Sequence, residues 1–202
     1  MTTARAAATP ARMPAEARRE QLLDVTKAIV LERGFHAVSI EGVAREAGIS
    51  RPIVYGHFDD LPGLLHALVA REGERALAQL QAALPPVEGD RADALLERLA
   101  AYLEAVRSDP GTWRLVLMPH EGAPRVLHER ISLGRRALVE QLAAALEPGS
   151  GTDLEPADAE LSAHMLTAFS DEAARLLLAD PERYPPERML RQARWFLGRL
   201  RP

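Results

Sequence analysis

The sequence predicts an all-α fold, because helical periodicity dominates it and no alternation typical of β-strands occurs. Apolar residues recur three and four positions apart through every long segment, and prolines or glycines separate these segments, as at Pro85-Pro86 and Asp180-Pro181. The third observation is a pair of short helices predicted on either side of Gly48. Together these patterns predict about nine helices, of which the first three or four form one unit and the others form a bundle.

The chain begins with a segment that lacks a helical pattern. Residues 1–14 are rich in alanine, threonine and proline, so we expect a disordered arm. Its arginines, Arg5 and Arg12, fit either a solvated tail or an arm that contacts the DNA minor groove. Residues 15–33 form the first predicted helix, which Gly34 ends. The apolar stripe of this helix consists of Leu22, Val25, Ile29 and Val30.

Two short helices are predicted between residues 39 and 58. Ser39 can cap the first of them by accepting a hydrogen bond from a free backbone N–H group. Gly48 ends that helix, because glycine tolerates the left-handed conformation found just past a helix end. Ser50 can cap the second helix, which carries Pro52 in its first turn. The apolar face of the first helix consists of Ile40, Val43, Ala44 and Ala47.

The second of these helices has an outward face without a carboxylate. Val54 and Phe58, four residues apart, are expected to point inward. The outward or flanking residues are Arg51, Pro52, Ile53, Tyr55, Gly56 and His57. Such a face suits a polyanion, with the residues at the start of the helix placed to meet base edges and those at its end placed to reach phosphate.

This segment resembles the DNA-binding domain of the TetR family of transcriptional regulators, through an Ala-x-x-Ala-Gly-Ile-Ser turn at residues 44–50 and Tyr-x-His-Phe at residues 55–58. The resemblance implies an N-terminal three-helix helix-turn-helix domain over residues 15–60, joined to a helical ligand-binding and dimerisation domain over residues 61–202. The expected DNA-binding residues are Ser39, Arg45, Ser50, Arg51, Pro52, Ile53, Tyr55, Gly56 and His57. Where the family commonly has a phosphate-binding lysine, this chain has Leu61.

The remaining helices follow from the spacing of the leucines and from the prolines and glycines that interrupt it. They are predicted at residues 61–84, 92–107, 113–118, 126–146, 157–179 and 186–200. The sequence Ser-Asp-Pro-Gly at residues 108–111 is predicted to be a turn.

Scarce large side chains gather on the later helices, where the resemblance implies a cavity for a small-molecule inducer. The expected ligand-binding residues are Tyr102, Trp113, Leu117, Met118, His128, His164, Met165 and Phe169. Apolar walls with a few polar tips are typical of ligand sites, although such residues at helical spacing also fit a plain core. Arg114, Glu121 and Arg175 can orient a polar group of the ligand.

The last two predicted helices are apolar on more than one side. Leu161, Met165, Ala168 and Leu176 share one side of the first, and Leu166, Phe169, Ala173 and Leu177 share another. The last helix adds Leu190, Trp195, Phe196 and Leu197. The resemblance implies a four-helix homodimer interface here, and the alternative is a thicker monomer core.

The sequence contains no pattern that predicts a metal site, a cofactor site or catalysis. It has no cysteine, and His120-Glu121 is followed by Gly-Ala-Pro rather than by a second histidine one turn later. The absence of a long apolar run predicts a cytoplasmic protein, and the net charge of −4 means that DNA contact depends on a local basic face. We therefore expect a repressor that binds a pseudo-palindromic operator and is released by a small molecule. The alternatives are a helical-bundle enzyme and a DNA-binding regulator without a ligand.

Overall fold

The computed structural model describes residues 13–85, 91–117, 125–146 and 156–199, and these ranges contain helices and no strand. The all-α prediction is confirmed. The helices are α1 (Ala15–Arg33), the short 3-10 helix η1 (Phe35–Ala37), α2 (Ile40–Glu46), α3 (Arg51–Tyr55), α4 (Leu61–Ala83), α5 (Arg91–Ser108), α6 (Pro110–Leu117), α7 (Arg125–Leu146), α8 (Pro156–Ala179) and α9 (Pro186–Arg199).

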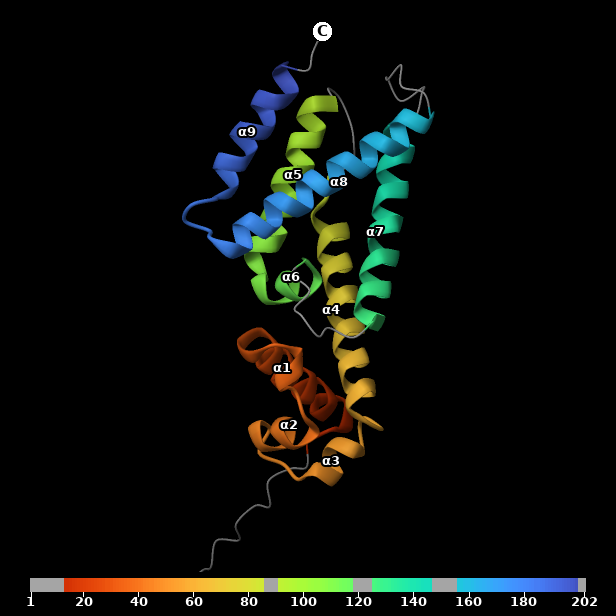
Figure 1. Cartoon of the computed structure of the whole chain (residues 1–202), viewed down its shortest axis with the longest axis vertical. Helices are drawn as coiled ribbons and strands as arrows, with labels where there is room; N and C mark the ends of the chain where they lie inside the picture. Colours follow the sequence, from red (N-terminus) through yellow and green to blue (C-terminus); the bar gives the residue numbers. More distant parts are fainter. Residues whose placement is uncertain (1–12, 86–90, 118–124, 147–155, 200–202) are drawn as a thin grey trace, which may run out of the picture.

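The molecule is elongated, with α1, α2 and α3 at one end and α5, α7, α8 and α9 at the other (Figure 1). Helix α4 runs from the first group into the second, and α6 lies beside α1 where the two groups meet (Figure 1). Any movement of the bundle relative to the first three helices therefore has to involve α4 or α6.

The helix-turn-helix is built by local signals that the sequence carries. Ser39 caps α2, since its Oγ accepts a hydrogen bond from the Gly42 N–H at 3.0 Å. Gly48 has a φ of 66°, the left-handed conformation that allows the chain to turn sharply after α2. Ser50 occupies the N-cap position of α3, but its side chain makes no capping bond, which corrects the prediction.

The reason for this correction lies in the first turn of α3. A capping hydroxyl bonds the N–H of the second or third helical residue. Here the second is Pro52, which has no N–H, and the N–H of Ile53 already bonds the backbone carbonyl of Ser50 at 3.0 Å. The proline therefore fixes the start of α3 in place of the side-chain cap.

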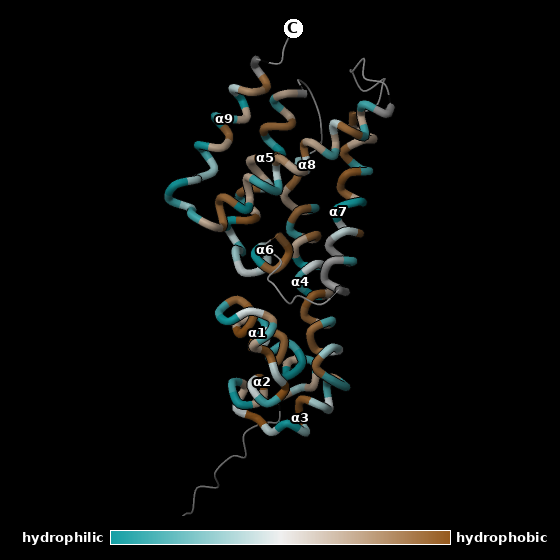
Figure 2. The backbone as a smooth tube through the Cα atoms, in the orientation of Figure 1, coloured by the Kyte–Doolittle hydropathy of each residue, from teal (hydrophilic) through white to brown (hydrophobic). Residues whose placement is uncertain are grey.

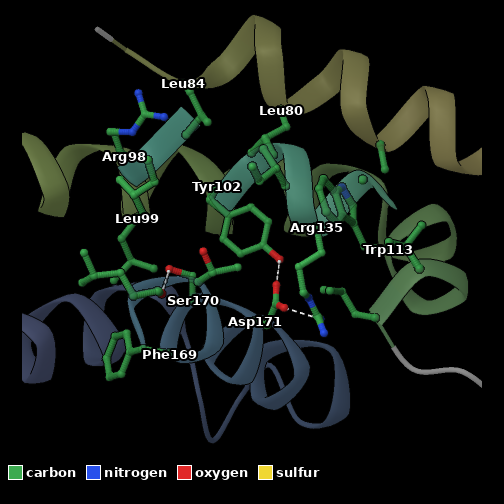
Figure 3. A pocket seen from close by; sticks show the side chains of 18 of the residues that line it. Leu80, Leu84, Arg98, Leu99, Tyr102, Trp113, Arg135, Phe169, Ser170 and Asp171 are labelled. Carbon is green, nitrogen blue, oxygen red and sulfur yellow. Dashed lines mark hydrogen bonds and ion pairs between the residues drawn. The ribbon is translucent and has the colours of Figure 1, made fainter. Parts of the chain in front are cut away.

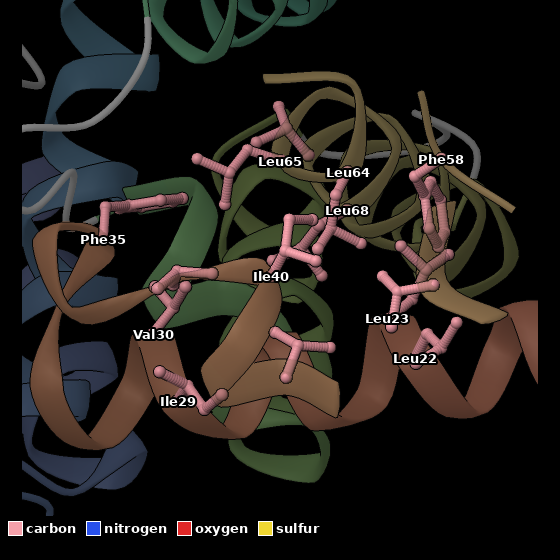
Figure 4. Packing of buried hydrophobic residues seen from close by; sticks show 14 of the residues in the cluster. Leu22, Leu23, Ile29, Val30, Phe35, Ile40, Phe58, Leu64, Leu65 and Leu68 are labelled. Carbon is pink, nitrogen blue, oxygen red and sulfur yellow. The ribbon is translucent and has the colours of Figure 1, made fainter. Parts of the chain in front are cut away.

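One hydrophobic core joins the first three helices to α4. Val54 and Phe58 are both buried in it, as the sequence predicted. Figure 4 shows Leu22 and Leu23 of α1 packed near Phe58, with Leu64, Leu65 and Leu68 of α4 above them. Leu115 of α6 belongs to the same core. The start of α4 is thus held firmly by the helix-turn-helix.

A second core lies inside the bundle. Hydrophobic residues recur along α4, α5 and α6 in the middle of the molecule, whereas the turn between α8 and α9 is hydrophilic (Figure 2). The buried members include Ala76, Leu80, Leu103, Val106 and Trp113. Helix α4 contributes to this core as well as to the first.

Among the described residues, no helix is long and apolar enough to cross a membrane.

Helix α6 begins three residues earlier than the sequence predicted. The segment at residues 108–111 was expected to be a turn, but Pro110 is the first residue of α6. Asp109 precedes it, and its Oδ1 accepts a hydrogen bond from the Thr112 N–H at 3.3 Å. An aspartate followed by a proline is also a helix start, because proline has no N–H to leave unbonded in the first turn.

Candidate DNA interface and ligand cavity

The predicted DNA-binding residues of α3, which we call the reading helix, are exposed on one side of this helix. Ile53 is 43% exposed and Tyr55 is 53% exposed, whereas Val54 between them is fully buried. Arg51 and Pro52 are exposed at the start of α3. The geometry leaves the side chains at the N-terminal end of α3 free to meet base edges in a major groove.

The flanking residues lie in three different settings. Arg45, Ser50 and Gly56 are exposed. Ser39 is exposed at the start of α2, where its hydroxyl is engaged in the cap. His57 is half-buried, and its backbone carbonyl takes part in a contact with α1.

Two features near α3 could not be read from the helix pattern. Arg19 of α1 donates from Nη1 to the His57 carbonyl at 2.9 Å, and its guanidinium lies 4.4 Å from the centroid of the Phe58 ring. This arginine therefore holds the two residues that follow the C-cap of α3. Glu41 of α2 lies 3.9 Å from Arg51, but both side chains are exposed, so the pair contributes little stability and leaves Arg51 available to DNA.

The bundle contains a cavity of about 740 Å³. Of the residues expected to bind a ligand, Tyr102, Trp113, Leu117, Met165 and Phe169 line it. Met118 lies outside the described residues, and so does the side chain of His128. The volume falls within the range of about 300–1,000 Å³ that is usual for small-molecule sites.

The structure places His164 away from the cavity lining. Its side chain is exposed, and its Nε2 lies 3.8 Å from the carboxylate of Glu160 one turn earlier. The neighbouring Ala163 is fully buried where α8 packs on α7, and this contact turns His164 toward solvent. We therefore leave His164 out of the proposed ligand site.

The cavity has a polar centre, formed by Tyr102, Asp171 and Arg135, that the sequence analysis did not predict. The Tyr102 hydroxyl donates to Asp171 Oδ1 at 3.2 Å, and the second oxygen of Asp171 forms an ion pair with Arg135 (Figure 3). Burial, followed by the negative charge of Asp171, raises the pKa of Tyr102 well above its ordinary value, so the phenol stays a hydrogen-bond donor. The sequence did not single out Asp171, because the same helix carries other carboxylates. It did not single out Arg135 either, because Arg135 is one of many arginines.

A polar cluster, of which Glu72 and Thr112 are buried, connects the cavity wall to α1, and we call it the junction cluster. It consists of Lys27 of α1, Glu72 and Gln79 of α4, and Asp109 and Thr112 at the start of α6. Lys27 Nζ donates to Glu72 Oε2 and to Thr112 Oγ1, both at 2.7 Å. Gln79 Nε2 donates to Asp109 Oδ2 at 2.9 Å. Lys27 is the chain's single lysine.

The cluster reaches the cavity through Trp113. The indole Nε1 donates to Gln79 Oε1 at 2.9 Å, and the indole ring contacts the Tyr102 ring edge-to-face at a centroid distance of 5.3 Å. Close by, an added Cβ at Gly111 would lie 3.2 Å from Leu31 Cδ1 and from Lys27 Cε, so α1 and α6 approach closely here. A displaced Trp113 would therefore act on the contact between α6 and α1.

Glu72 is only 1% exposed, yet it is held in its charged form. Burial alone would raise the pKa of Glu72, but hydrogen bonds from Lys27 and Thr112, together with the charges of Lys27 and Arg71, offset this effect. The net result is a pKa below the ordinary value of 4.5.

Acid is therefore expected to weaken the fold through Glu72. Above pH 4.5 the carboxylate is charged in both states and its stabilisation is fully present. As the pH falls below that value, the unfolded chain takes up the proton first, and the stabilisation is lost until the pH passes the lower folded pKa. Urea unfolding between about pH 6 and pH 2 measures this loss. The variant Glu72→Gln should show a flatter pH dependence, and an unchanged slope would contradict the assignment.

Comparisons with known proteins agree with the helix-turn-helix and with the whole fold. The family model described as "Bacterial regulatory proteins, tetR family" matches residues 22–68, which include α2, the turn and α3. A TetR-like transcriptional regulator from Rhodococcus sp. RHA1 has a TM-score of 0.70 and 26% identity, covering 91% of this chain and 97% of that one. The chain belongs to the TetR family.

Sequence relatives extend the match beyond the helix-turn-helix. The transcriptional activator FasR of Mycolicibacterium smegmatis is 26% identical over 167 residues, which is 83% of this chain and 75% of FasR. Three uncharacterised mycobacterial regulators are 27% identical over 127 residues, which is 62% of this chain and 63% of each of theirs. As a member of the TetR family, the chain is a DNA-binding transcriptional regulator and not an enzyme.

This TetR-family chain exposes large apolar residues on its last two helices. On α8, Leu161 is 59% exposed and Met165 is 66% exposed, and on α9, Trp195 is 49% exposed beside Phe196. The other side of α8 faces inward, since Ala173 and Leu177 are buried and Leu166 is partly buried. Leu190 and Leu197 of α9 are partly buried and pack against the bundle core.

Proposed function

We propose that this TetR-family regulator is a cytoplasmic repressor that binds a pseudo-palindromic operator as a homodimer and is released by a small molecule in the cavity. The observation that carries the proposal is the position of α4. Leu64 and Leu68 belong to the core of the reading domain, and Ala76 and Leu80 belong to the bundle core beside the cavity. A ligand that moves the bundle end of α4 therefore moves the reading helix.

Small movements are sufficient for release. Two reading helices have to lie about 34 Å apart to enter successive major grooves of one DNA molecule. A ligand that prefers the wrongly spaced dimer about a hundredfold at each of two sites supplies roughly 5 kcal/mol, which shifts most of the population. Linkage requires the reverse effect, so bound operator weakens ligand binding by the same factor.

A gel-shift assay with the DNA upstream of the chain's own gene tests the first step. Specific binding is expected at nanomolar protein, and its absence on all neighbouring promoters would contradict the proposal. The same complex is then titrated with candidate ligands, and release is expected. A promoter–reporter assay gives the sign of regulation, which matters because the relative FasR is named as an activator.

The reading role of α3 predicts different effects for two substitutions. Arg51→Ala removes a side chain placed at base edges, so it is expected to weaken specific binding by about 1–3 kcal/mol and to relax selectivity at one base position. Tyr55→Phe removes one hydroxyl placed for phosphate, so it should weaken binding to all sequences alike. Binding to the operator and to point-mutated operators measures both effects. Equal changes in selectivity for the two variants would contradict the separate roles.

A further inference from the structure

The charged groups of the cavity wall differ in how they are paired. Arg135 forms its ion pair with Asp171, and Glu74, another lining residue, is exposed and has an interaction partner of its own. Arg98 of α5 donates from Nη1 to the backbone carbonyl of Pro85 at 2.6 Å. Within the part of the chain that the structure describes, no carboxylate pairs with Arg98. Its guanidinium carries five N–H donors, and among these described residues it meets one neutral acceptor.

Arg98 lies in an apolar setting at one end of the cavity. It is half-buried beside Leu84, and Trp113 lies toward the opposite end, with Leu99 and Tyr102 between them (Figure 3). Burial lowers the pKa of Arg98, because removal from water disfavours its charge. An anion that entered from the cavity would compensate for this loss of hydration.

We propose that the cavity binds an amphipathic anion, whose carboxylate or phosphate head pairs with Arg98 and whose apolar body extends past Leu99 and Tyr102 toward Trp113. The inference rests on the proposed function, since it names the class of ligand for the same cavity. A body that reaches Trp113 presses on the residue whose indole bonds Gln79 of the junction cluster. The head provides affinity, and the far end of the body changes the contact with α1.

The same residues disfavour the other classes of head group. A cationic head would meet Arg98 and would find the Asp171 carboxylate already taken by Tyr102 and Arg135. A neutral head accepts a hydrogen bond without compensating the buried charge, and hydrogen bonds to charged partners are roughly twice as strong as neutral ones. The apolar walls contact the tails of anionic, cationic and neutral ligands alike. The head group alone therefore determines which of the three classes binds most tightly.

Calorimetric titration of the full chain with four ten-carbon probes tests the inference. Decanoate, decyl phosphate, decanol and decyltrimethylammonium share one apolar tail and differ in the charge of the head, and each is used below its micelle concentration. We expect decanoate or decyl phosphate to bind about tenfold or more tightly than decanol, and the cationic probe to bind most weakly. The anion that binds more tightly identifies the head as carboxylate or phosphate.

Variants on α5 provide the matched control. Arg98→Met should abolish the preference for the anion, and Arg98→Lys should keep part of it. Arg107→Met, at an exposed position on the same helix outside the cavity lining, should bind like the wild type. Circular dichroism checks that each variant is folded.

The outcomes separate the inference from the proposed function. Binding of decanol as tightly as both anions by the wild type, or an unchanged preference in folded Arg98→Met, overturns the anionic class and leaves the ligand cavity standing. If no probe binds to the wild type, the ligand cavity itself is overturned, and the inference fails with it. The comparison of head groups in the wild-type protein tests the anionic class of ligand even if Arg98→Met does not fold.

Discussion

Replacing Glu72 by alanine is expected to lower the free energy of unfolding by about 3–5 kcal/mol. The carboxylate accepts hydrogen bonds from Lys27, Thr112 and Arg71, and it is almost fully buried. Its removal takes away the main counter-charge of the Lys27 ammonium. The remaining cluster partners of Lys27 are the Thr112 hydroxyl and, at 3.7 Å, the Asp109 carboxylate. Breaking a buried pair on one side costs more than the pair contributes, because the remaining charge is left desolvated.

Urea unfolding followed by circular dichroism measures this loss, at one fixed protein concentration in case the chain associates. Glu74→Ala, an exposed position two residues further along α4, serves as the control and should change stability by about 1 kcal/mol or less. The double variant Lys27→Met with Glu72→Met is expected to be more stable than Glu72→Ala, since the pair is then removed together. Equal, small losses for Glu72→Ala and the control would mean that the cluster does not hold α1, α4 and α6 together.

Charging the outer face of α8 or α9 is expected to weaken operator binding by about 100-fold or more. Leu161→Glu and Trp195→Arg each place a charge on an exposed apolar face, which would lie inside the proposed homodimer interface. A monomer has one reading helix and loses the gain from binding two half-sites together. Neither residue lines the cavity, so ligand affinity is a separate readout.

Sedimentation velocity measures the association, and a gel shift with the operator measures the binding. Ala78→Glu introduces the same negative charge as Leu161→Glu at an exposed position on α4 and should remain dimeric, so it controls for that added charge alone. Dimers with wild-type operator affinity in both Leu161→Glu and Trp195→Arg would place the interface elsewhere. Leu197→Glu is unsuitable for this purpose, because Leu197 packs into the bundle core.

The helix-turn-helix could be predicted because its signals are local. Ser39 and Gly48 act on residues within one turn of themselves, and the structure confirms both. Val54 and Phe58 followed from helical spacing alone. The structure differs from the prediction where one pattern has two meanings, as with Asp109-Pro110, or where the facing helix decides the orientation of a side chain, as with His164.

The junction cluster and the polar centre of the cavity could not be predicted, for a different reason. Lys27 and Thr112 are 85 residues apart in the sequence, and Tyr102 and Asp171 are 69 apart. No spacing rule relates such positions, because their contact depends on how whole helices pack. The scarcity of lysine was visible in the sequence, but it gave no indication of a partner.

The close approach of α1 and α6 at Gly111 has an evolutionary consequence. A single base change in a glycine codon gives alanine or a larger residue, and any such residue pushes against Leu31 and Lys27. Under the proposed function, a point mutation at position 111 would change the coupling between the cavity and the DNA-binding helices, while the residues proposed to contact operator and ligand stay as inherited. Position 111 would then offer selection a means to adjust the threshold of a regulatory circuit separately from the signals that the circuit connects.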